Sequence, residues 1–326
     1  MDIVFFNEHQ HGDLILGKQN VRWIVENSPK NVNFYYLHNK HPESVFVHER
    51  IKHIRTDINF HASPLPMMER FFKQKGLLPD ALWVSTWVGS INGVVKLIDE
   101  NGWERYLLPN NDNTYKIGVN AELWDNMDIQ LMLCKQNIDI INSFLISNFV
   151  YYKIPYPNSR EDMLIKWNSN SKKIDDLNKI LLPEYKLKVL ICNGDTISNQ
   201  RANFDYGVYL KNIIETHSDV LFYFTQNVSL KLPNVININE RIGFPNIDEI
   251  EYLSKFCNVI VTSLSGPGCT VVNDAVVKDP DKILIHFCRE IIGLVYDKHL
   301  CKCIQTEDYS FENITNIIEN AILEKK

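Results

Sequence analysis

Short apolar runs separated by amphipathic stretches account for most of the second half of the chain. The runs predict strands over residues 188–192, 219–224, 235–238, 258–263 and 282–287. The stretches between them predict helices over residues 204–217, 246–256 and 268–277, and a terminal helix with apolar residues at helical spacing follows Ser310 as its cap. Strands that are apolar at every position are typical of a parallel sheet covered by helices on both faces.

The first half begins with the same alternation of strand and helix. The pattern predicts strands over residues 2–6, 32–37, 44–48 and 81–87, and a helix over Leu14–Glu26. The middle of this half is less regular and includes a proline-containing segment over residues 61–71. The first strand, helix and second strand therefore indicate a second sheet of the same kind.

A connector rich in proline, asparagine and charged residues, over residues 151–186, separates the two halves and includes one predicted helix. The expected fold class is α/β, with two Rossmann-like doubly wound domains facing each other across a cleft. The domains are expected over residues 1–165 and 166–326, and the terminal helix could return to pack on the first domain. In such folds ligands bind at the carboxyl ends of the strands.

Composition narrows the class of protein without naming a function. The 326 residues carry a net charge of −6, which gives no general case for a nucleic-acid partner. Seven cysteines, an odd number mostly within apolar runs, predict buried reduced thiols rather than a disulfide framework. The N-terminus lacks the pattern of a signal peptide, and no apolar run approaches the length of a transmembrane segment. We therefore expect a cytoplasmic protein.

Three segments of the second half follow predicted strands and carry candidate binding residues. Ser265-Gly266-Pro267-Gly268 opens a predicted helix, whose free N–H groups could hold a phosphate; an ordinary tight turn is the alternative. Asn193 and Arg201, in the loop after residues 188–192, could reach a diphosphate or belong to a solvated loop. Glu240, in an expected loop, could bind ribose hydroxyls or be a surface carboxylate.

Asp13 is the candidate catalytic residue of the first half. It stands between the first strand and the first helix, where a carboxylate can cap the helix or take a proton from a sugar hydroxyl. His9 and His11 could favour its ionised form or bind substrate, and no third ligand nearby supports a metal pair. Trp87, four residues after Trp83, could stack on a sugar ring or serve in packing.

Three other features have simpler structural interpretations. The Asp-Pro-Asp segment over residues 279–281 precedes a strand, where aspartate and proline are ordinary turn residues. His286 ends a predicted strand and is expected to be a packed histidine. Cys301 and Cys303 have the spacing of metal ligands but lack a second pair.

On these residues the chain resembles the glycosyltransferases of the GT-B fold, and among them the heptosyltransferase-like group. The resemblance rests on Gly12-Asp13 after the first strand, on the late Ser-Gly turn that opens a helix, and on the terminal helix. It implies that Asp13 is the general base and that Ser265, Gly266 and Gly268 hold the donor diphosphate.

The chain also departs from that family's pattern. His11 occupies a position where the family has an arginine or a small residue, and no histidine follows the late turn. Residues 193–201 replace the family's lysine-bearing loop. These departures mean that a heptose donor is not implied.

The predicted function is the transfer of a sugar from a nucleotide-sugar donor to a carbohydrate or other hydroxyl acceptor. Asp13 would act as the base, with inversion at the anomeric carbon and with no cofactor or metal ion. The first domain, with His9, His11, Gly12 and Trp87, would bind the acceptor, and the second domain the donor. Two alternatives remain open: a nucleotide-sugar epimerase of the same fold, and a non-catalytic protein that binds nucleotides or sugars.

Overall fold

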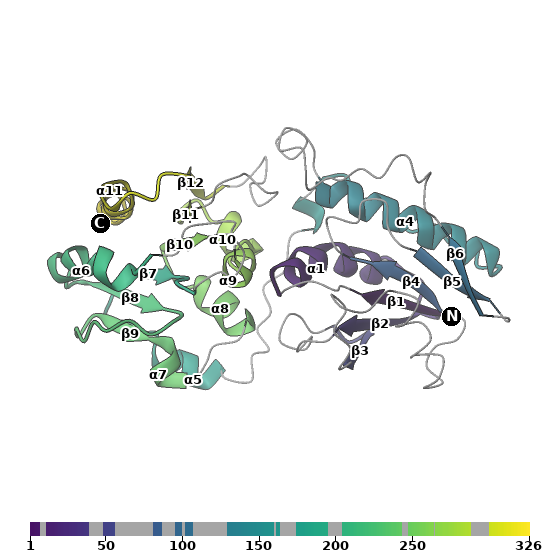
Figure 1. Ribbon diagram of the computed structural model, residues 1–326, viewed down its shortest axis with the longest axis horizontal. Helices are drawn as coiled ribbons and strands as arrows, with labels where there is room; N and C mark the ends of the chain where they lie inside the picture. Colours follow the sequence, from purple (N-terminus) through teal and green to yellow (C-terminus); the bar gives the residue numbers. More distant parts are fainter. Residues whose placement is uncertain are drawn as a thin grey trace. The chain divides into compact units, whose positions relative to one another are not determined.

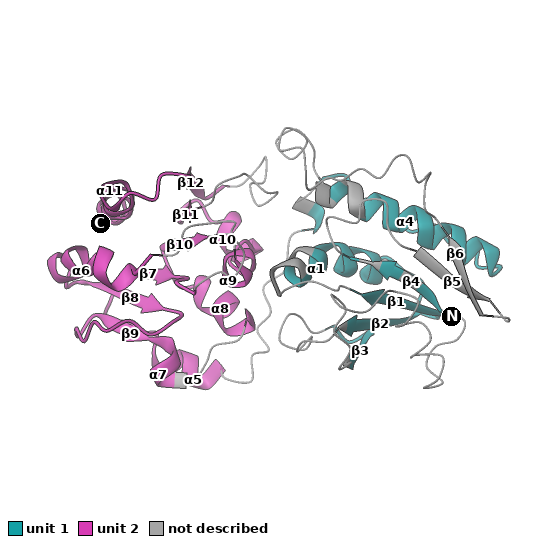
Figure 2. Cartoon of the chain, in the orientation of Figure 1, with its two compact units in different colours: residues 1–164 teal, residues 165–326 magenta. Residues whose placement is uncertain are grey.

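The computed structural model divides the chain into two compact units, Met1–Leu164 and Ile165–Lys326, shown in Figure 2. Each unit is described here by itself. The structure describes residues 1–6, 11–38, 48–55, 81–86, 95–99, 102–106, 129–159, 161–163, 174–194, 204–242, 247–263, 265–287 and 300–326.

The first unit is built on a mixed sheet (Figure 1). Its strands are β1 (Asp2–Phe6), β2 (Asn33–His38), β3 (Ile51–Arg55), β4 (Leu82–Ser85), β5 (Val95–Asp99) and β6 (Gly102–Tyr106). They lie in the order β3-β2-β1-β4-β5-β6, in which β1 to β4 are parallel and the last two strands are antiparallel to their neighbours. The helices are α1 (His11–Glu26), α4 (Ile129–Ser147) and the short 3-10 helix η4 (Glu161–Met163).

The core of the first unit explains why β1 is apolar at every position after Asp2. Ile3, Val4, Phe5 and Phe6 are all buried, as expected of a central strand that is covered on both faces. Helix α4 packs beside α1 and against β4 through apolar residues at helical spacing, among them Cys134, Ile138, Ile141 and Leu145. The central strands thus form the sheet that positions the start of α1.

The structure corrects the expected start of the first helix. Helix α1 begins at His11 rather than at Leu14, so Asp13 is its third residue and not the residue that precedes it. Asp13 therefore lies in the first turn and is not the N-cap. The strands expected over residues 2–6, 32–37 and 81–87 are present as β1, β2 and β4, whereas residues 44–47 lie outside the described residues.

The second unit contains an entirely parallel sheet in the described part of the chain. Its strands are β7 (Leu187–Ile191), β8 (Val220–Phe224), β9 (Val235–Asn237), β10 (Val259–Ser263), β11 (Ile283–Phe287) and β12 (Lys302–Thr306). Their order is β12-β11-β10-β7-β8-β9. The helices are α5 (Ile174–Lys179), α6 (Tyr206–Thr216), α7 (Ile238–Ile242), α8 (Ile247–Ser254), α9 (Gly266–Thr270), α10 (Asp274–Val277) and α11 (Phe311–Lys325).

One face of this sheet is covered by α6 and α11, which lie beside each other. Ile314, Ile318 and Ile322 of α11 join the buried side chains of α6 and of the strands in one apolar core. Ser310 caps α11 by accepting a hydrogen bond from the Asn313 N–H, as its sequence predicts. The terminal helix is therefore part of the second unit's own core, whereas the sequence leaves open its return to the first domain.

Two further expectations for the second unit are wrong in detail. The helix expected over residues 268–277 is divided into α9 and α10, because Asn273 accepts from the Ala275 N–H at 3.0 Å and starts a new helix. Glu240 lies in the short helix α7 and not in a loop. The strand β12, which contains Cys303, has no counterpart among the elements expected from the sequence.

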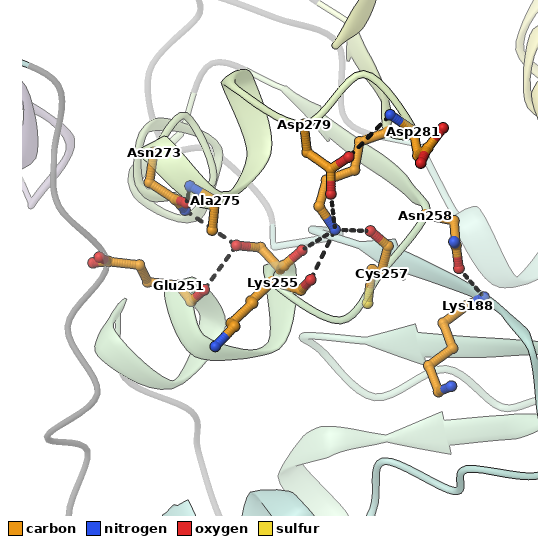
Figure 3. Close-up of polar contacts among 11 residues, drawn as sticks. Lys188, Glu251, Lys255, Cys257, Asn258, Asn273, Ala275, Asp279 and Asp281 are labelled. Atoms are coloured by element: carbon orange, nitrogen blue, oxygen red, sulfur yellow. Dashed lines mark hydrogen bonds and ion pairs between the residues drawn. The ribbon is translucent and has the colours of Figure 1, made fainter. Parts of the chain in front are cut away.

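A buried lysine fixes the turn between α8 and β10. The Lys282 ammonium donates to the carbonyls of Ser254, Lys255 and Cys257 at 3.3, 2.8 and 2.6 Å, and lies 3.9 Å from Asp279 Oδ2. Figure 3 labels three of these partners, Lys255, Cys257 and Asp279, and marks their contacts with dashed lines. Burial lowers the pKa of Lys282, while carbonyls at a helix C-terminus favour a cation.

The Asp-Pro-Asp segment belongs to this same turn. Asp279 Oδ1 accepts a hydrogen bond from the Asp281 N–H at 2.9 Å, and its other oxygen faces Lys282. This arrangement agrees with the turn expected from the sequence and leaves this carboxylate pair in a structural role.

Candidate functional site

The carboxyl edge of the second sheet contains a topological switch point between β7 and β10. The chain proceeds from β7 outward to β8 and β9, and from β10 in the opposite direction to β11 and β12. The Cys192 N–H donates to the Val261 carbonyl at 2.8 Å and keeps the ends of β7 and β10 together. Ligands of doubly wound folds bind outside the strand ends at such a point, so the segments that follow β7 and β10 define the candidate site.

Asn193, directly after β7, is engaged in holding two loops together. Its Oδ1 accepts from the Gln226 N–H at 2.8 Å, its Nδ2 donates to the Gln226 carbonyl at 3.0 Å, and its backbone N–H donates to Thr225 Oγ1 at 3.1 Å. These bonds join the turn after β7 to the turn after β8. Asn193 is therefore a positioning residue at the edge of the site, and its amide is already paired.

Ser265 organises the turn after β10 as the N-cap of α9. Its Oγ accepts from the Gly268 N–H at 3.1 Å, and its carbonyl accepts from the Cys269 N–H at 2.8 Å. Pro267 has no N–H, so within the described residues the N–H groups of this turn that have no hydrogen-bond partner are those of Ser265 and Gly266. The helix start thus offers a ligand fewer donors than the sequence suggests.

Gly268 is explained by the close packing of α9 on β10. A Cβ atom at this position would lie 1.9 Å from the Ser263 carbonyl oxygen and 2.6 Å from Thr262 Oγ1. No other residue type leaves room for this contact. Gly268 therefore brings the Ser265 turn directly over the carboxyl end of β10, which is a structural contribution to the site.

His286 lies in register with Thr262 on the neighbouring strand β11, so the two side chains emerge on the same face of the sheet. Both residues are buried, and neither ring nitrogen of His286 has a hydrogen-bond partner among the residues that the structure describes. Burial lowers the pKa of His286 from 6.5 to about 4, which makes the imidazole neutral at physiological pH. The interpretation of His286 as a packed histidine agrees with this burial.

The burial of His286 predicts a pH-dependent stability. Below pH 6.5 the unfolded chain takes up a proton that the folded chain resists down to about pH 4. The free energy of unfolding should therefore fall as the pH drops through this range, by up to about 3 kcal/mol. Urea unfolding of the wild type and of His286→Leu, from pH 8 to pH 4, would measure it. Parallel pH profiles for the two proteins would contradict the prediction.

Glu240 lies apart from the switch point. Its Oε1 accepts from Asn237 Nδ2 at 3.2 Å, at the carboxyl end of the edge strand β9. Strands β8 and β7 separate β9 from β10, which at roughly 4.8 Å per strand is about 14 Å. The structure therefore does not place Glu240 beside Ser265.

The first unit has its own switch point, between β1 and β4. The Thr86 N–H donates to the Phe6 carbonyl at 2.9 Å, and Thr86 Oγ1 lies 2.9 Å from the Tyr36 hydroxyl. A Cβ atom on Gly17 would lie 2.7 Å from the Thr86 carbonyl oxygen, so α1 packs closely against the end of β4. Thr86 and Gly17 were not candidates in the sequence, although an isolated glycine within a helix is a signal of close packing.

Asp13 precedes Gly17 by four residues on α1. Residues four apart lie on the same face of a helix, so position 13 lies one turn beyond the contact with Thr86, towards the helix start. This places its backbone at the carboxyl edge of the sheet. The side chain of Asp13 lies outside what the structure describes. His11 and Gly12 are the first two residues of α1, whereas His9, Trp87 and Arg201 lie outside the described residues.

Cys301 and Cys303 have the spacing of metal ligands. Burial raises the pKa of Cys301 to about 12 and that of Cys303 to about 11, which favours the protonated thiol over the thiolate at both positions. Within the described ranges, no three histidine, cysteine or acidic residues gather to form a metal site. No helix in those ranges combines the length and the apolar character that are needed to cross a membrane.

The chain thus contains two doubly wound α/β units, each with a switch point at its carboxyl edge. No family model matches the sequence, and no curated protein matches it. The likeness to solved structures is nevertheless extensive and covers nearly the whole chain.

A glycosyl transferase of family 9 from Veillonella parvula has a TM-score of 0.52 at 11% identity, over 98% of this chain and 91% of that one. The ADP-heptose heptosyltransferase II of E. coli also has a TM-score of 0.52 at 11% identity, over 100% and 99% of the two chains. The E. coli heptosyltransferase WaaC, solved with ADP, has a TM-score of 0.50 at 10% identity, over 98% and 100%. The chain therefore shares the fold of the GT-B glycosyltransferases, as the resemblance in its sequence implies.

Proposed function

We propose that the protein is a glycosyltransferase that moves a sugar from a nucleotide-sugar donor to a hydroxyl group of an acceptor. The observation that supports this proposal most strongly is that each unit has a switch point with the start of a helix beside it. The fold also matches that of glycosyltransferases over nearly their whole length. One of these similar structures was solved with ADP. A nucleoside diphosphate is therefore the ligand that we assign to the second unit.

The donor diphosphate would lie at the end of β10, beside the Ser265 turn. The Gly266 N–H supplies one donor there, and Arg201, which follows β7 in the sequence, would supply a guanidinium. Because the developing charge on the diphosphate is met by these groups, the proposed reaction needs no metal ion. Glu240 is too far from β10 to bind the diphosphate, and in this scheme it would contact the nucleoside.

Asp13 would act on the acceptor. Its carboxylate takes the proton of the acceptor hydroxyl while that oxygen attacks the anomeric carbon of the donor sugar. The bond between this carbon and the diphosphate oxygen breaks, and its electron pair leaves with the diphosphate. A direct displacement of this kind inverts the anomeric centre. The first unit, with His11 and Gly12 at the start of α1, would bind the acceptor.

Thermal unfolding with a panel of nucleoside diphosphates and nucleotide sugars, with and without magnesium, tests the donor site. A ligand at about 100 times its Kd stabilises the folded protein by about 2.7 kcal/mol, or on the order of 5 to 10 °C in Tm. We expect one nucleotide to give such a shift without magnesium. Arg201→Gln should reduce the shift, whereas Lys211→Gln, on the exposed face of α6, should leave it unchanged.

The outcomes separate the possible functions. Absence of a shift with every nucleotide would contradict the proposal. A shift accompanied by conversion of the donor sugar without use of any acceptor would indicate an epimerase, and a shift without turnover or donor hydrolysis would indicate a binding protein. Product analysis by mass spectrometry with the stabilising nucleotide sugar distinguishes these results.

A further inference from the structure

A group of exposed apolar and aromatic side chains follows the C-terminal end of α4 in the first unit. This group, the aromatic turn, consists of Ile146, Phe149, Tyr151, Tyr152 and Tyr156, with exposed fractions of 56, 82, 84, 43 and 40%. Single exposed apolar residues are normal, but five within eleven consecutive positions form a local patch. The patch plays no part in the proposed transfer reaction.

The backbone of Phe149 is unusual for so large a residue. The Val150 N–H donates to the Leu145 carbonyl at 2.8 Å and the Phe149 N–H to the Ile146 carbonyl at 3.0 Å, which is the Schellman pattern of a helix end. The central residue of that pattern adopts the left-handed conformation, and Phe149 has φ 60°. Glycine or asparagine normally occupies this position, because a bulky side chain is strained there.

The segment that follows is fixed firmly to the body of the unit. The Ile154 N–H donates to Asn142 Oδ1 at 2.8 Å, and Asn142 Nδ2 donates to the Ile154 carbonyl at 3.2 Å. Trp23 Nε1 donates to the Pro155 carbonyl at 2.9 Å. Ile154 itself is buried. The exposed rings are therefore presented by an ordered backbone that is anchored to both α4 and α1.

Folding alone does not explain this combination. Phe149 places a large apolar ring in water and a strained backbone at a position that asparagine would fill more favourably. Strain and exposure coincide at one residue, and aromatic neighbours surround it in the sequence. Such a coincidence indicates a surface that contacts something outside the chain.

We infer that the aromatic turn binds the surface of a lipid bilayer. Tyrosine and phenylalanine side chains partition into the interfacial region, where an apolar ring and a polar edge are both accommodated. Within residues 146–157 the single charged residue is Lys153, whose ammonium lies 5.9 Å from the Tyr156 ring centre. A lysine beside inserted aromatic rings suits an anionic head group.

Two other partners fit the patch less well. A stable dimer buries about 800 Å² on each partner with about 20 to 30 residues, which is far more than this one turn offers. A glycan site needs polar groups around the stacking ring, yet the Asn148 amide donates to the Phe144 carbonyl and the Tyr156 hydroxyl donates to Asp139. A bilayer requires only that a few side chains insert.

Flotation with lipid vesicles tests the inference on the full-length protein. The wild type should float with phosphatidylcholine vesicles that contain phosphatidylglycerol. A Phe149→Asn/Tyr151→Ser variant should lose at least about tenfold in partition, since each buried aromatic ring contributes a comparable factor. Leu323→Ser, which removes an apolar side chain that is 54% exposed on α11 of the second unit, should float like the wild type.

The melting temperature is the measurement that would change if Phe149 had only a structural role. Asparagine tolerates the left-handed conformation, so Phe149→Asn alone should keep or raise the Tm while it weakens vesicle binding. A large loss of Tm in this variant would show that Phe149 stabilises the fold and would overturn the inference. The inference would also be overturned if the wild type did not float with the vesicles. The same holds if the only effect of the Phe149→Asn/Tyr151→Ser substitutions were to convert a dimer to a monomer in sedimentation. None of these results depends on the proposed transfer activity.

Discussion

Replacing Gly268 with alanine is expected to destabilise the second unit by about 3 to 5 kcal/mol, at the upper end of what one added methyl group causes. The new Cβ atom would lie 1.9 Å from the Ser263 carbonyl oxygen, a backbone atom at the end of a buried strand. Relief requires that α9 move away from β10, and this movement also breaks the bond from Ser265 Oγ to the Ser263 carbonyl.

Urea unfolding followed by circular dichroism measures this effect. Gly194→Ala is a matched control, since a Cβ atom there would lie 3.6 Å from Gln226 Nε2, which is an ordinary contact. The control should change the free energy of unfolding by less than about 0.5 kcal/mol. Equal stabilities for the two variants would contradict the packing of α9 that the structure shows.

Asp13→Asn is expected to abolish most of the transfer activity while the fold is retained. Loss of a general base lowers kcat by about 10²- to 10⁴-fold. Asparagine and aspartate have similar helix propensities, and the lost carboxylate in the first turn of α1 costs less than about 1 kcal/mol through the helix dipole. Binding of the nucleotide in the second unit should be unaffected.

Initial rates with the donor found by thermal unfolding measure this loss. Asp2→Asn is the matched control, because Asp2 accepts a hydrogen bond from Asn33 Nδ2 at 2.8 Å near the surface of β1. The control should have wild-type kcat and KM. If Asp13→Asn also has wild-type kcat, Asp13 has only a structural role at the start of α1. Another group must then remove the proton from the acceptor hydroxyl.

Most of the central strands could be predicted from the sequence, as could the edge strand β9, whereas the other three edge strands could not. Strands β1, β7, β8, β10 and β11 are apolar at nearly every position because helices cover both faces. The edge strands β3, β6 and β12 have the sequences IKHIR, GWERY and KCIQT, in which polar residues hide the strand pattern. Helix α4 did carry a recognisable signal, in Cys134, Ile138, Ile141 and Leu145 at helical spacing.

The position of the candidate site could be predicted from the sequence, but its hydrogen bonds and packing distances could not. Ser265 at a strand end correctly predicts a helix cap at the carboxyl edge. The number of free N–H groups cannot be predicted in this way, since it depends on Ser265 accepting from Gly268 and Cys269. The role of Gly268 likewise depends on the distance between α9 and β10, and the pairing of Asn193 depends on Gln226, 33 residues later.

The buried thiols of the two units have a practical consequence. Cys134 in α4 and Cys257 after α8 are both fully buried, and burial raises the pKa of each thiol. A thiol reagent can modify either one only when the surrounding unit opens, since it needs an accessible thiolate. The rate of alkylation at each cysteine, read by peptide mass spectrometry, therefore reports the opening of one unit separately from the other. The native chain therefore contains, in each of its halves, a cysteine whose alkylation rate measures how often that half opens.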